Sequence, residues 1–576
     1  MRAAILLVVM GAQVAAMSGC AGRSTPDNGI KNPVLAEVLS PAAMAGGETG
    51  SIMDPSSLAP TELRFGRSPK PDPNVTYQSG VIVMPHGDTA ITSMESNGII
   101  WHFKADAPQV DQIQEDAVIF ATERCVGRVL HVDRTGNDVR VVLGPVQITD
   151  VFQKAHFVLD QPLDLTKVIA VAAPDFPNPT PPPAESPAPS SGVPVPAGAP
   201  SESPSPLSSP TSTGDASRPR LVAMTYSLVS PDGKWRPFRA MTFDARGAPH
   251  RARLQRASRH VPEKLAQAAP GGVPNLSAPD PSGQIPTVDI AGGLDATPCL
   301  IKCGGLGLDM TYDQGGIKIY AYAVLYVQNP RAQVNLNIQG GVKSTGIHLT
   351  GVAGFKAHYE LGADKSFVRN VHLNGDIPID LTFLVNMLTP VSVHLTQSLI
   401  LNTGFSARIS TISGTFDYAM CCGFGVGYNG TGYGSDGPEK FAEKNHIAGD
   451  VTGISVGINS VVLSLRQQVM FGIGVLGFAT GPYAGLVEST TILKQSSAAT
   501  PITLPIGADV GCHQATFQLA VDGGVGWTIN RVVVAVVNFF LSVFHTKAIP
   551  SKGTFIEIPQ QVIIGHRYEK PDKCSG

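Results

Sequence analysis

A proline-rich stretch from Pro174 to Pro219 divides the chain into two parts of different size. Proline has no backbone N–H and a fixed φ, so a stretch this rich in proline forms neither a helix nor an inner strand. Serine, alanine and threonine fill most other positions, and few large apolar residues are present to build a core. The sequence therefore predicts an extended, solvated linker over residues 174–219 that acts as a spacer between folded parts.

The overall composition argues against nucleic acid as a partner and favours a β-rich fold. The net charge is −3 at pH 7, so the molecule as a whole has no electrostatic bias toward a polyanion. Charged residues make up 15 % of the chain and aromatic residues 6 %, whereas glycine is abundant with 61 residues. This profile is typical of β-rich proteins outside the cytoplasm. No cofactor is predicted.

The first residues have the pattern of a bacterial secretion signal. Arg2 supplies a positive charge, and an apolar stretch too short to span a membrane follows it, with the sequence AILLVVMGAQVAAM. Met17-Ser18-Gly19-Cys20 then resembles the lipobox of bacterial lipoproteins, with methionine where leucine is usual. The resemblance implies that residues 1–19 are removed as a signal peptide. It also implies that Cys20 becomes an acylated N-terminus, which its acyl chains hold in a membrane.

The same resemblance predicts where the protein is located. Ala21 stands where lipoproteins of the Gram-negative inner membrane commonly have aspartate, so we expect sorting to the outer membrane. The protein would then face the periplasm or be exposed at the cell surface. Residues 20–60 contain glycine, proline and serine, and they are predicted to tether the first folded domain to the anchor.

Residues 61–173 carry short alternating apolar runs, which predict a small β domain, barrel-like in form. The clearest signal is a hairpin from Val129 to Gly144, with its turn at residues 136–138. Residues 147–157 fit either a short helix or a further strand. The acidic and histidine side chains show no spacing that forces a metal site, so we expect surface groups rather than ligands at His86, Asp88, His102, Asp106, Asp111, Glu115 and Asp116.

Residues 220–287 combine a predicted hairpin, the most basic stretch of the chain, and a loop. The hairpin runs from Leu221 to Phe243 around a turn at residues 231–233. A short helix is predicted from Arg251 to His260, ended before Pro262. Two interpretations stay open, namely contact with a polyanion such as anionic lipid headgroups and a solvated helix face. The candidate polyanion contacts are Arg251, Arg253, Arg256 and Arg259.

Residues 288–576 predict a large antiparallel sandwich or barrel, and the fold class predicted for the chain is all-β. Apolar and polar residues alternate with period two over Gln333–Gln339 and Val391–Leu395, so one face of each strand is expected to be buried. An outer-membrane barrel would have aromatic girdles, and this region is poor in aromatic residues. The apolar run Val532–Phe544 is too short for a membrane-spanning helix and fits either a buried element or a membrane contact.

Glycine-rich motifs in this region are interpreted as incidental. GxGxxG occurs at residues 425-427-430, 432-434-437 and 472-474-477, but no helix pattern follows to receive a pyrophosphate. We expect a flexible loop for the first two copies and a close-packed strand for the third. Gly453-Ile454-Ser455-Val456-Gly457 has the letters of a nucleophile elbow, yet strand-forming residues follow Ser455 where a helix is needed. No catalytic residue is predicted.

The cysteines fit an oxidising compartment. The chain has 8 cysteines, one of which is the predicted acylation site Cys20. Those after the linker are predicted to form disulfides of open connectivity, and they are Cys299, Cys303, Cys421, Cys422, Cys512 and Cys574. Zinc held by Cys299, Cys303 and the vicinal pair is the alternative, although paired C-x₂-C spacing is missing. Cys125 is predicted to be buried and unpaired in the small domain.

Three functions from different classes are consistent with these features. The first is a lipid-anchored cell-envelope protein with a non-enzymatic binding or scaffolding role, whose partner is an envelope protein, a lipid or a glycan. The second is a carrier of lipid or another hydrophobic ligand, because the apolar strands exceed what one sheet face needs. The third is a hydrolase of envelope polymers or esters, for which the motif around Ser455 is the only support.

Overall fold

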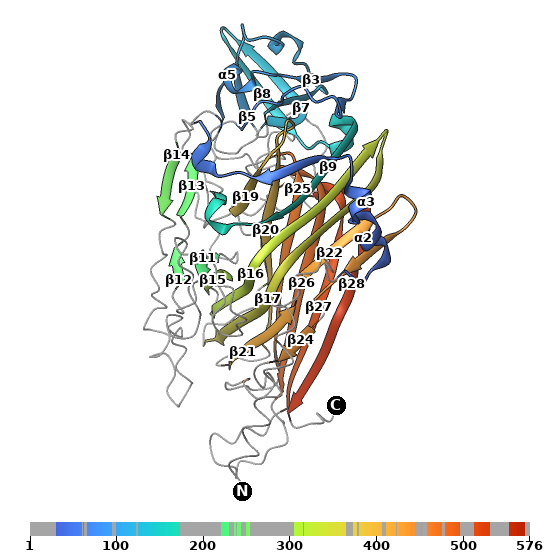
Figure 1. Ribbon diagram of the computed structural model, residues 1–576. Helices are drawn as coiled ribbons and strands as arrows, with labels where there is room; N and C mark the ends of the chain where they lie inside the picture. Colours follow the sequence, from blue (N-terminus) through green and yellow to red (C-terminus); the bar gives the residue numbers. More distant parts are fainter. Residues whose placement is uncertain are drawn as a thin grey trace, which may run out of the picture.

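A computed structural model describes residues 30–59, 62, 66–94, 100–122, 125–172, 221–229, 235–237, 239–243, 249–253, 305–314, 316–364, 372–376, 379–405, 410–421, 423–438, 440–443, 451, 458–474, 478–495, 512–529 and 552–570. Within these ranges the chain is nearly all β, which confirms the predicted fold class. A small β domain lies at one end of two large sheets of long strands (Figure 1). The predicted signal peptide, the linker over residues 174–219 and the apolar run Val532–Phe544 lie outside the described residues.

The small domain is a six-stranded mixed sheet in the order β3-β6-β7-β8-β5-β4. Its strands are β3 (Val81–Val83), β4 (Ile91–Met94), β5 (Ile100–Lys104), β6 (Val118–Thr122), β7 (Cys125–Thr135) and β8 (Asp138–Gly144), with α5 (Gly87–Ala90) and η3 (Val110–Gln112) between them. Trp101 and Phe103 are buried in its core, as the alternating runs predict. The predicted hairpin is confirmed, since Thr135 pairs with Asp138 and Gly136 supplies a φ of 61° for the tight turn.

The first large sheet, sheet I, is built around a hairpin of two long antiparallel strands, β16 (Ile317–Gln339) and β17 (Val342–Ala363). The first half of β16 pairs with β15 (Gly305–Gln314), which continues to β11 (Leu221–Val229) and β12 (Trp235–Pro237). Its second half pairs with β9 (Phe152–Pro162), beside which lies β2 (Thr76–Tyr77). On the other side, β17 pairs with β21 (Ser410–Cys421) and β22 (Gly423–Tyr428), which continue to β24 (Lys440–Glu443) and β23 (Tyr433–Asp436), respectively.

The second large sheet, sheet II, is antiparallel, and its main strands follow the order β10-β19-β20-β25-β26-β27-β28. These strands are β10 (Ile169–Ala172), β19 (Ile379–Asn386), β20 (Val391–Phe405), β25 (Ile458–Gly472), β26 (Phe478–Gln495), β27 (Cys512–Ile529) and β28 (Lys552–Lys570). β18 (His372–Asp376) pairs with the second half of β20, and η4 (Leu165–Lys167) connects β9 to β10. Consecutive strands of the chain therefore lie side by side from β25 to β28.

Strand β1 (Glu48–Ile52) joins the two sheets. Its first residues pair in parallel with β9 of sheet I, and its last residues pair antiparallel with β19 of sheet II. The inner faces of the two sheets meet in one apolar core. The ring centroids of Tyr418 on β21 and Phe517 on β27 are 4.2 Å apart, and those of Phe157 on β9 and Phe471 on β25 are 6.5 Å apart. Two sheets that share a core in this way form the predicted sandwich.

Strand β16 unites two stretches that the sequence predicts as separate strands. Asn329 has a positive φ of 45°, and Pro330 follows it without a backbone N–H, so the pairing with β17 is interrupted at this point. Opposite the interruption, Gly351 has a φ of 86°, and a Cβ there would lie 2.4 Å from the carbonyl oxygen of Gln328. On one side, this strand of 23 residues pairs with β17 along most of its length. On its other side, it pairs with β15 before the irregularity and with β9 after it.

The small domain ends earlier than the predicted boundary at residue 173. Residues 147–157 were predicted to form either a short helix or a strand, and they form both, because α6 (Ile148–Val151) leads directly into β9. β9 and β10 belong to the large sheets, where Phe157 and Leu159 are buried in the common core. The predicted domain of residues 61–173 is therefore wrong at its C-terminal end, since the apolar face of β9 is covered by the large domain rather than by the small one.

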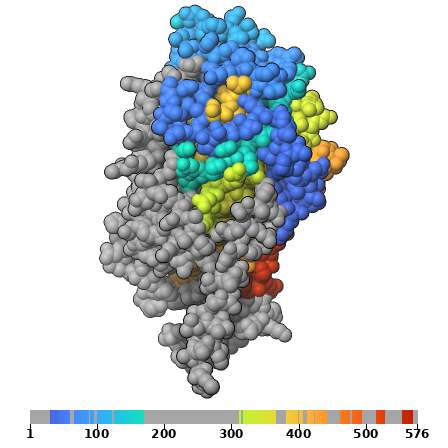
Figure 2. Space-filling model, in the orientation of Figure 1, coloured from blue at the N-terminus to red at the C-terminus, as the bar shows by residue number. Residues whose placement is uncertain are grey.

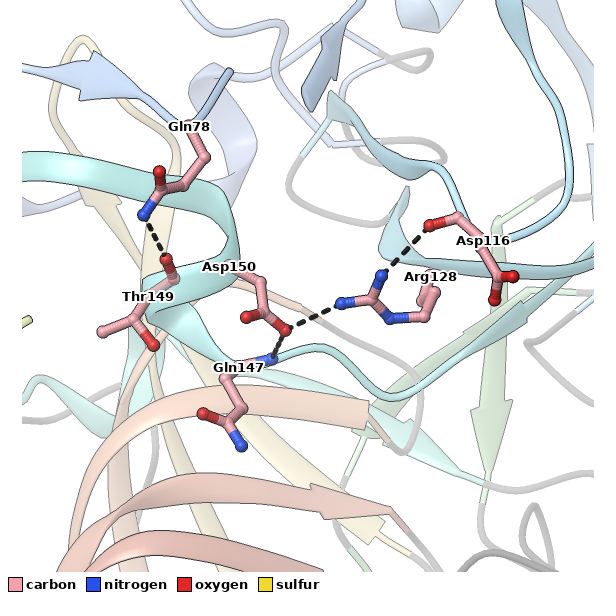
Figure 3. A network of polar contacts seen from close by, with 6 residues as sticks. All are labelled: Gln78, Asp116, Arg128, Gln147, Thr149 and Asp150. Atoms are coloured by element: carbon pink, nitrogen blue, oxygen red, sulfur yellow. Dashed lines mark hydrogen bonds and ion pairs between the residues drawn. The ribbon is translucent and has the colours of Figure 1, made fainter. Parts of the chain in front are cut away.

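Arg128 on β7 connects the small domain to the start of the large sheets (Figure 3). Its Nη2 donates to Asp150 Oδ2 in α6 at 3.1 Å, and its Nη1 donates to the carbonyl oxygen of Asp116 at 3.0 Å. Asp150 also accepts the backbone N–H of Gln147 at 3.2 Å, which caps α6. Because α6 leads into β9, these hydrogen bonds orient the small domain relative to sheet I.

Much of the predicted tether is folded onto the large domain. Its described part comprises α2 (Pro33–Val38), α3 (Pro41–Met44), β1 and η2 (Pro55–Ser57). Leu35 and Val38 of α2 are buried against Gly346 of β17 and Gly427 of β22, which have no side chains to keep the helix away. Figure 2 shows the dark blue N-terminal segment lying against segments coloured turquoise and yellow-green. The tether prediction is wrong for residues 30–58, because their few apolar residues have a sheet face to cover.

The glycine-rich stretch that we expected to be a flexible loop is a β-hairpin. β22 and β23 pair from Gly425 with Asp436 to Tyr428 with Tyr433, so a strand follows the turn where a phosphate-binding motif has a helix. Asp436 Oδ2 accepts the backbone N–H of Asn32 at 2.9 Å, which ties this hairpin to α2. The third glycine motif is described only over residues 472–474, and there Gly472 at the end of β25 is close-packed as expected, because a Cβ on it would collide with the backbone of the neighbouring chain segment.

The hairpin predicted from Leu221 to Phe243 is confirmed in its first part, where Val229 pairs with Trp235. The rest of the predicted return strand is β13 (Arg239–Phe243), which pairs with β14 (Pro249–Arg253) instead. Arg251 and Arg253 lie on β14, so the helix predicted from Arg251 to His260 is wrong for these residues. The alternation in Arg-Ala-Arg fits the period of a strand, and the pairing with β13 stabilises it. Arg256 and Arg259 lie outside the described residues.

The contact between Gly434 and α2 predicts the effect of adding one methyl group. Asn32 is the N-cap of α2, and its Oδ1 accepts the backbone N–H of Val34 at 3.0 Å. A Cβ at Gly434 would overlap this Oδ1 atom, so Gly434→Ala is expected to displace the cap. The loss should be about 1 kcal/mol of stability, with faster proteolysis within residues 30–44. Gly432→Ala is the matched control, because its nearest neighbouring atom is Asn429 Oδ1 at 3.9 Å. Equal proteolysis of both variants would contradict this account.

Candidate ligand-binding site

Three long polar side chains lie on the largely apolar inner face of sheet II. Gln397 on β20 is the direct partner of Gln467 on β25, and Glu488 on β26 is the direct partner of Leu465, two residues from Gln467. Side chains two residues apart share a face of a strand, so the three groups lie on the same side as the apolar residues beside them. We call Gln397, Gln467 and Glu488 the polar row.

The polar row is buried and not satisfied by hydrogen bonds within the described part of the chain. Gln397, Gln467 and Glu488 are 5 %, 1 % and 2 % exposed, respectively. Gln397 Oε1, both polar atoms of the Gln467 side chain and both carboxyl oxygens of Glu488 have no hydrogen-bond partner there. Leaving such a group unpaired in an apolar interior costs about 1–3 kcal/mol. Native interiors rarely contain several such atoms together, so this cluster requires an explanation.

Burial favours the neutral form of the Glu488 carboxyl. Desolvation raises the pKa of Glu488 well above its ordinary value, and the nearby Gln467 side chain opposes part of that shift. Gln467 is thus close enough to act on the carboxyl, but the two side chains do not reach hydrogen-bond geometry. A protonated carboxyl offers one donor and an acceptor, and a carboxamide offers two donors and an acceptor.

The surroundings of the polar row are apolar. Leu486 and the buried Thr490 flank Glu488 on the same face of β26, and Leu519 on β27 is its direct partner on the other side. From sheet I, Tyr418 reaches over to Phe517, two residues from Leu519. No lysine or arginine is buried among the described residues. The arrangement can therefore hold a neutral hydrogen-bonding group within an apolar setting.

A second polar cluster lies on the outer face of sheet I, where polar contacts connect its members in pairs. Lys356 Nζ lies 3.8 Å from Asp417 Oδ2, and His358 Nε2 lies 3.3 Å from Glu360 Oε1. The ring of Tyr322 stacks on His358 with their centroids 5.3 Å apart, and burial raises the pKa of Tyr322. Each acidic side chain here has a lysine or histidine side chain beside it, so we assign this cluster a structural role.

A third cluster lies at the strand that joins the sheets. Glu48, the first residue of β1, accepts the backbone N–H of Leu388 at 2.5 Å. Burial raises its pKa to about 7, and a hydrogen bond to the Asp72 side chain and the negative charge of Asp72 add to the rise. The Leu388 N–H and the positive charge of Arg67 oppose it. A protonated Glu48 therefore holds the seam between the sheets at acidic pH.

The raised pKa of Glu48 predicts that the seam loses stability as the pH rises. The folded protein holds this proton up to about pH 7, whereas the unfolded chain releases it near pH 4.5. The contribution of protonated Glu48 to the free energy of unfolding therefore falls between these two pH values and is constant above them. Glu48→Gln keeps a side-chain oxygen that can accept the backbone N–H of Leu388, and its carboxamide does not titrate. Between pH 4.5 and 7.5, we expect wild type to lose about 1 kcal/mol of stability relative to Glu48→Gln. This is less than the free energy that corresponds to the whole pKa shift, because solvent screens the half-buried carboxyl.

Thermal unfolding across this pH range measures that difference. Glu557→Gln on β28 is a suitable control, because Glu557 is exposed and far from β1 along the sheet. A pH-independent difference between wild type and Glu48→Gln would show that the carboxyl does not titrate in the seam.

Three of the predicted cysteine positions lie within the described residues. Cys421 at the end of β21 is disulfide-bonded, in agreement with the predicted set. Cys512 is the first residue of β27. Cys125 is buried and unpaired in the small domain, as predicted, and burial raises its thiol pKa. The remaining predicted positions lie outside the described residues, namely Cys20, Cys299, Cys303, Cys422 and Cys574.

The other residues considered from the sequence do not come together. His102 Nδ1 lies 2.8 Å from Asp138 Oδ2, and Glu115 Oε1 lies 2.9 Å from His131 Nδ1, so each pairs locally on the small domain. Within the described ranges, no group of three or more histidine, cysteine, aspartate or glutamate side chains is placed to hold a metal ion. Ser455 of the elbow-like motif lies outside the described residues. Arg251 and Arg253 remain candidate polyanion contacts on β14.

Sequence reasoning missed the polar row, although a signal was present. Leu486, Glu488, Thr490 and Ile492 alternate with the residues between them, and Glu488 falls in the apolar phase of that alternation. An acid in the phase that faces the core is unusual and marks a site that packing alone does not explain. Gln467 holds the corresponding position between Leu465 and Val469.

Comparisons with known proteins divide the chain in a similar way. Residues 61–154 match the family model described as domain of unknown function DUF8403, and residues 274–556 match that described as domain of unknown function DUF8402. The first match covers the small domain, and the second covers most of the large sheets together with the polar row. No curated protein and no solved structure matches the chain. None of the helices in the described ranges has the length and apolar character needed to cross a membrane.

Proposed function

We propose that this protein is a lipid-anchored bacterial envelope protein whose large β domain binds a hydrophobic ligand between its two sheets. The role is non-enzymatic, and the ligand is a lipid or another apolar molecule with a polar group. The observation that carries the proposal is the polar row, whose buried atoms lack partners in an apolar core. A bound molecule that supplies hydrogen bonds at this place would remove the cost of burying them.

The architecture supports a ligand that is mainly apolar. Strands of 15 to 23 residues line the common core, far longer than the usual strand of about five or six residues. Their inner faces present leucine, valine, isoleucine and phenylalanine. Ligand sites of this kind combine a mostly apolar lining with a few placed polar groups that fix orientation. A scaffolding role without a ligand would leave the polar row unexplained.

The proposed anchor makes a separate prediction at Cys20. In this account Cys20→Ala prevents acylation, so the protein should move from the membrane fraction to the soluble periplasmic fraction. Fractionation of cells that express wild type and variant, with mass measurement of the mature N-terminus, checks the prediction. Cys125→Ala is the matched control, because this unpaired cysteine lies within the small domain. A variant that stays in the membrane fraction would contradict anchoring through Cys20.

The ligand makes a prediction at Glu488. Full-length protein purified from the envelope should carry an adduct in native mass spectrometry, and organic extraction should release it as a free hydrophobic molecule. Glu488→Leu should lower the bound fraction about tenfold, the effect of losing roughly one good hydrogen bond. The variant should remain at least as stable as wild type, because leucine removes the buried acid.

The control for this experiment lies on the same strand. Thr491 is exposed on β26, on the other face from Glu488, so Thr491→Leu should keep the adduct. A clean polypeptide mass for wild type, without any extractable molecule, would count against the ligand and in favour of a scaffolding role.

A further inference from the structure

The polar row also restricts the chemistry of the ligand, on the condition that the proposed function holds. None of its members brings a positive charge, since two are carboxamides and the third is a buried carboxyl whose neutral form burial favours. Together they offer both donors and acceptors. They offer no positive charge, and no lysine or arginine is buried in the described part of the core.

An anionic headgroup would be strongly disfavoured at such a place. Moving an isolated ion into an apolar interior is costly unless an opposite charge or several strong donors accompany it. The negative charge of a phosphate would raise the pKa of the nearby Glu488 carboxyl further, and the phosphate would find no ion-pair partner there. Arg466, which is on the same strand as Gln467, lies on the outer face of sheet II, where its Nη2 is 2.7 Å from Asp522 Oδ1.

We infer that the site between the sheets selects amphiphiles with a neutral, hydrogen-bonding headgroup, of the hydroxyl, ester or amide class, and rejects those with a phosphate. The glutamine side chains of β20 and β25 and the carboxyl of β26 lie on three adjacent strands. Adjacent strands are about 4.8 Å apart, so the row spans roughly 10 Å. A headgroup with several polar atoms, such as glycerol with its ester oxygens, matches groups distributed over this distance.

The test uses two probes with the same acyl chains, dioleoylglycerol and dioleoyl phosphatidate, which differ by one phosphate. Full-length protein in detergent is freed of bound lipid on a hydrophobic resin, incubated with each probe and examined by native mass spectrometry at pH 7. We expect dioleoylglycerol to be retained at least about tenfold better than phosphatidate. Equal or better retention of phosphatidate would overturn the selectivity and leave the proposed function in place.

Two variants separate hydrogen bonding from shape. Glu488→Gln keeps a neutral donor and acceptor, so it should retain dioleoylglycerol and the preference over phosphatidate. Glu488→Leu should lose about tenfold in retention, whereas Thr491→Leu on the other face of β26 should behave as wild type. Thermal unfolding of each variant confirms that it is folded. Loss of dioleoylglycerol binding in folded Glu488→Gln would contradict the inference.

A pH series gives a readout that a purely structural role would not change. Retention by wild type should fall when the pH is raised far enough to ionise Glu488, and retention by Glu488→Gln should stay constant. If neither probe binds, the molecule extracted from the native protein decides the question. A neutral headgroup supports the inference and a charged one overturns it, while the absence of any extracted ligand overturns the proposed function itself.

Discussion

The need to cover two apolar sheet faces with each other governs the architecture of the large domain. Each sheet buries its inner face only because the other lies opposite, and within the described residues β1 is the strand that pairs with both. Glu48 at the start of this strand is half-buried, and its carboxyl is stabilised in the protonated form. The backbone pairing that joins the sheets is thus short and begins at a carboxyl whose pKa burial raises, whereas the sheets themselves are long.

The sequence predicted those features that depend on local pattern. Period-two alternation marked the strands, and residues 129–144 marked a hairpin because a tight turn follows directly from Gly136 and Asn137. The features that it did not predict depend on distant partners. α2 was predicted as part of a tether because residues 20–60 contain glycine, proline and serine, yet it packs against Gly346 and Gly427, which lie hundreds of residues away. β9 was assigned to the small domain because its partner β16 lies beyond the linker.

The candidate site shows the same division. The alternation around Glu488 was visible in the sequence, but its significance depends on which face of β26 meets sheet I. The glycine motifs gave a stronger local signal and proved to be a hairpin and a close-packed strand, because glycine there permits close approach rather than phosphate binding. A motif of glycine residues at fixed spacing is therefore weaker evidence for a candidate site than a polar residue in the buried phase of a strand.

Water alone is a poor substitute for a ligand at the polar row. Five polar atoms of Gln397, Gln467 and Glu488 lack partners, and they belong to three adjacent strands. A buried water needs two to four polar neighbours, so water would satisfy the row only as a chain of several ordered molecules in an apolar core. Leucine at position 488 would avoid the cost altogether, since replacing a buried ionisable group with an apolar one is often neutral or stabilising. A fold that keeps an acid there accepts lower stability, and the proposed headgroup, which would use the acid as a hydrogen-bonding partner, would account for that compromise.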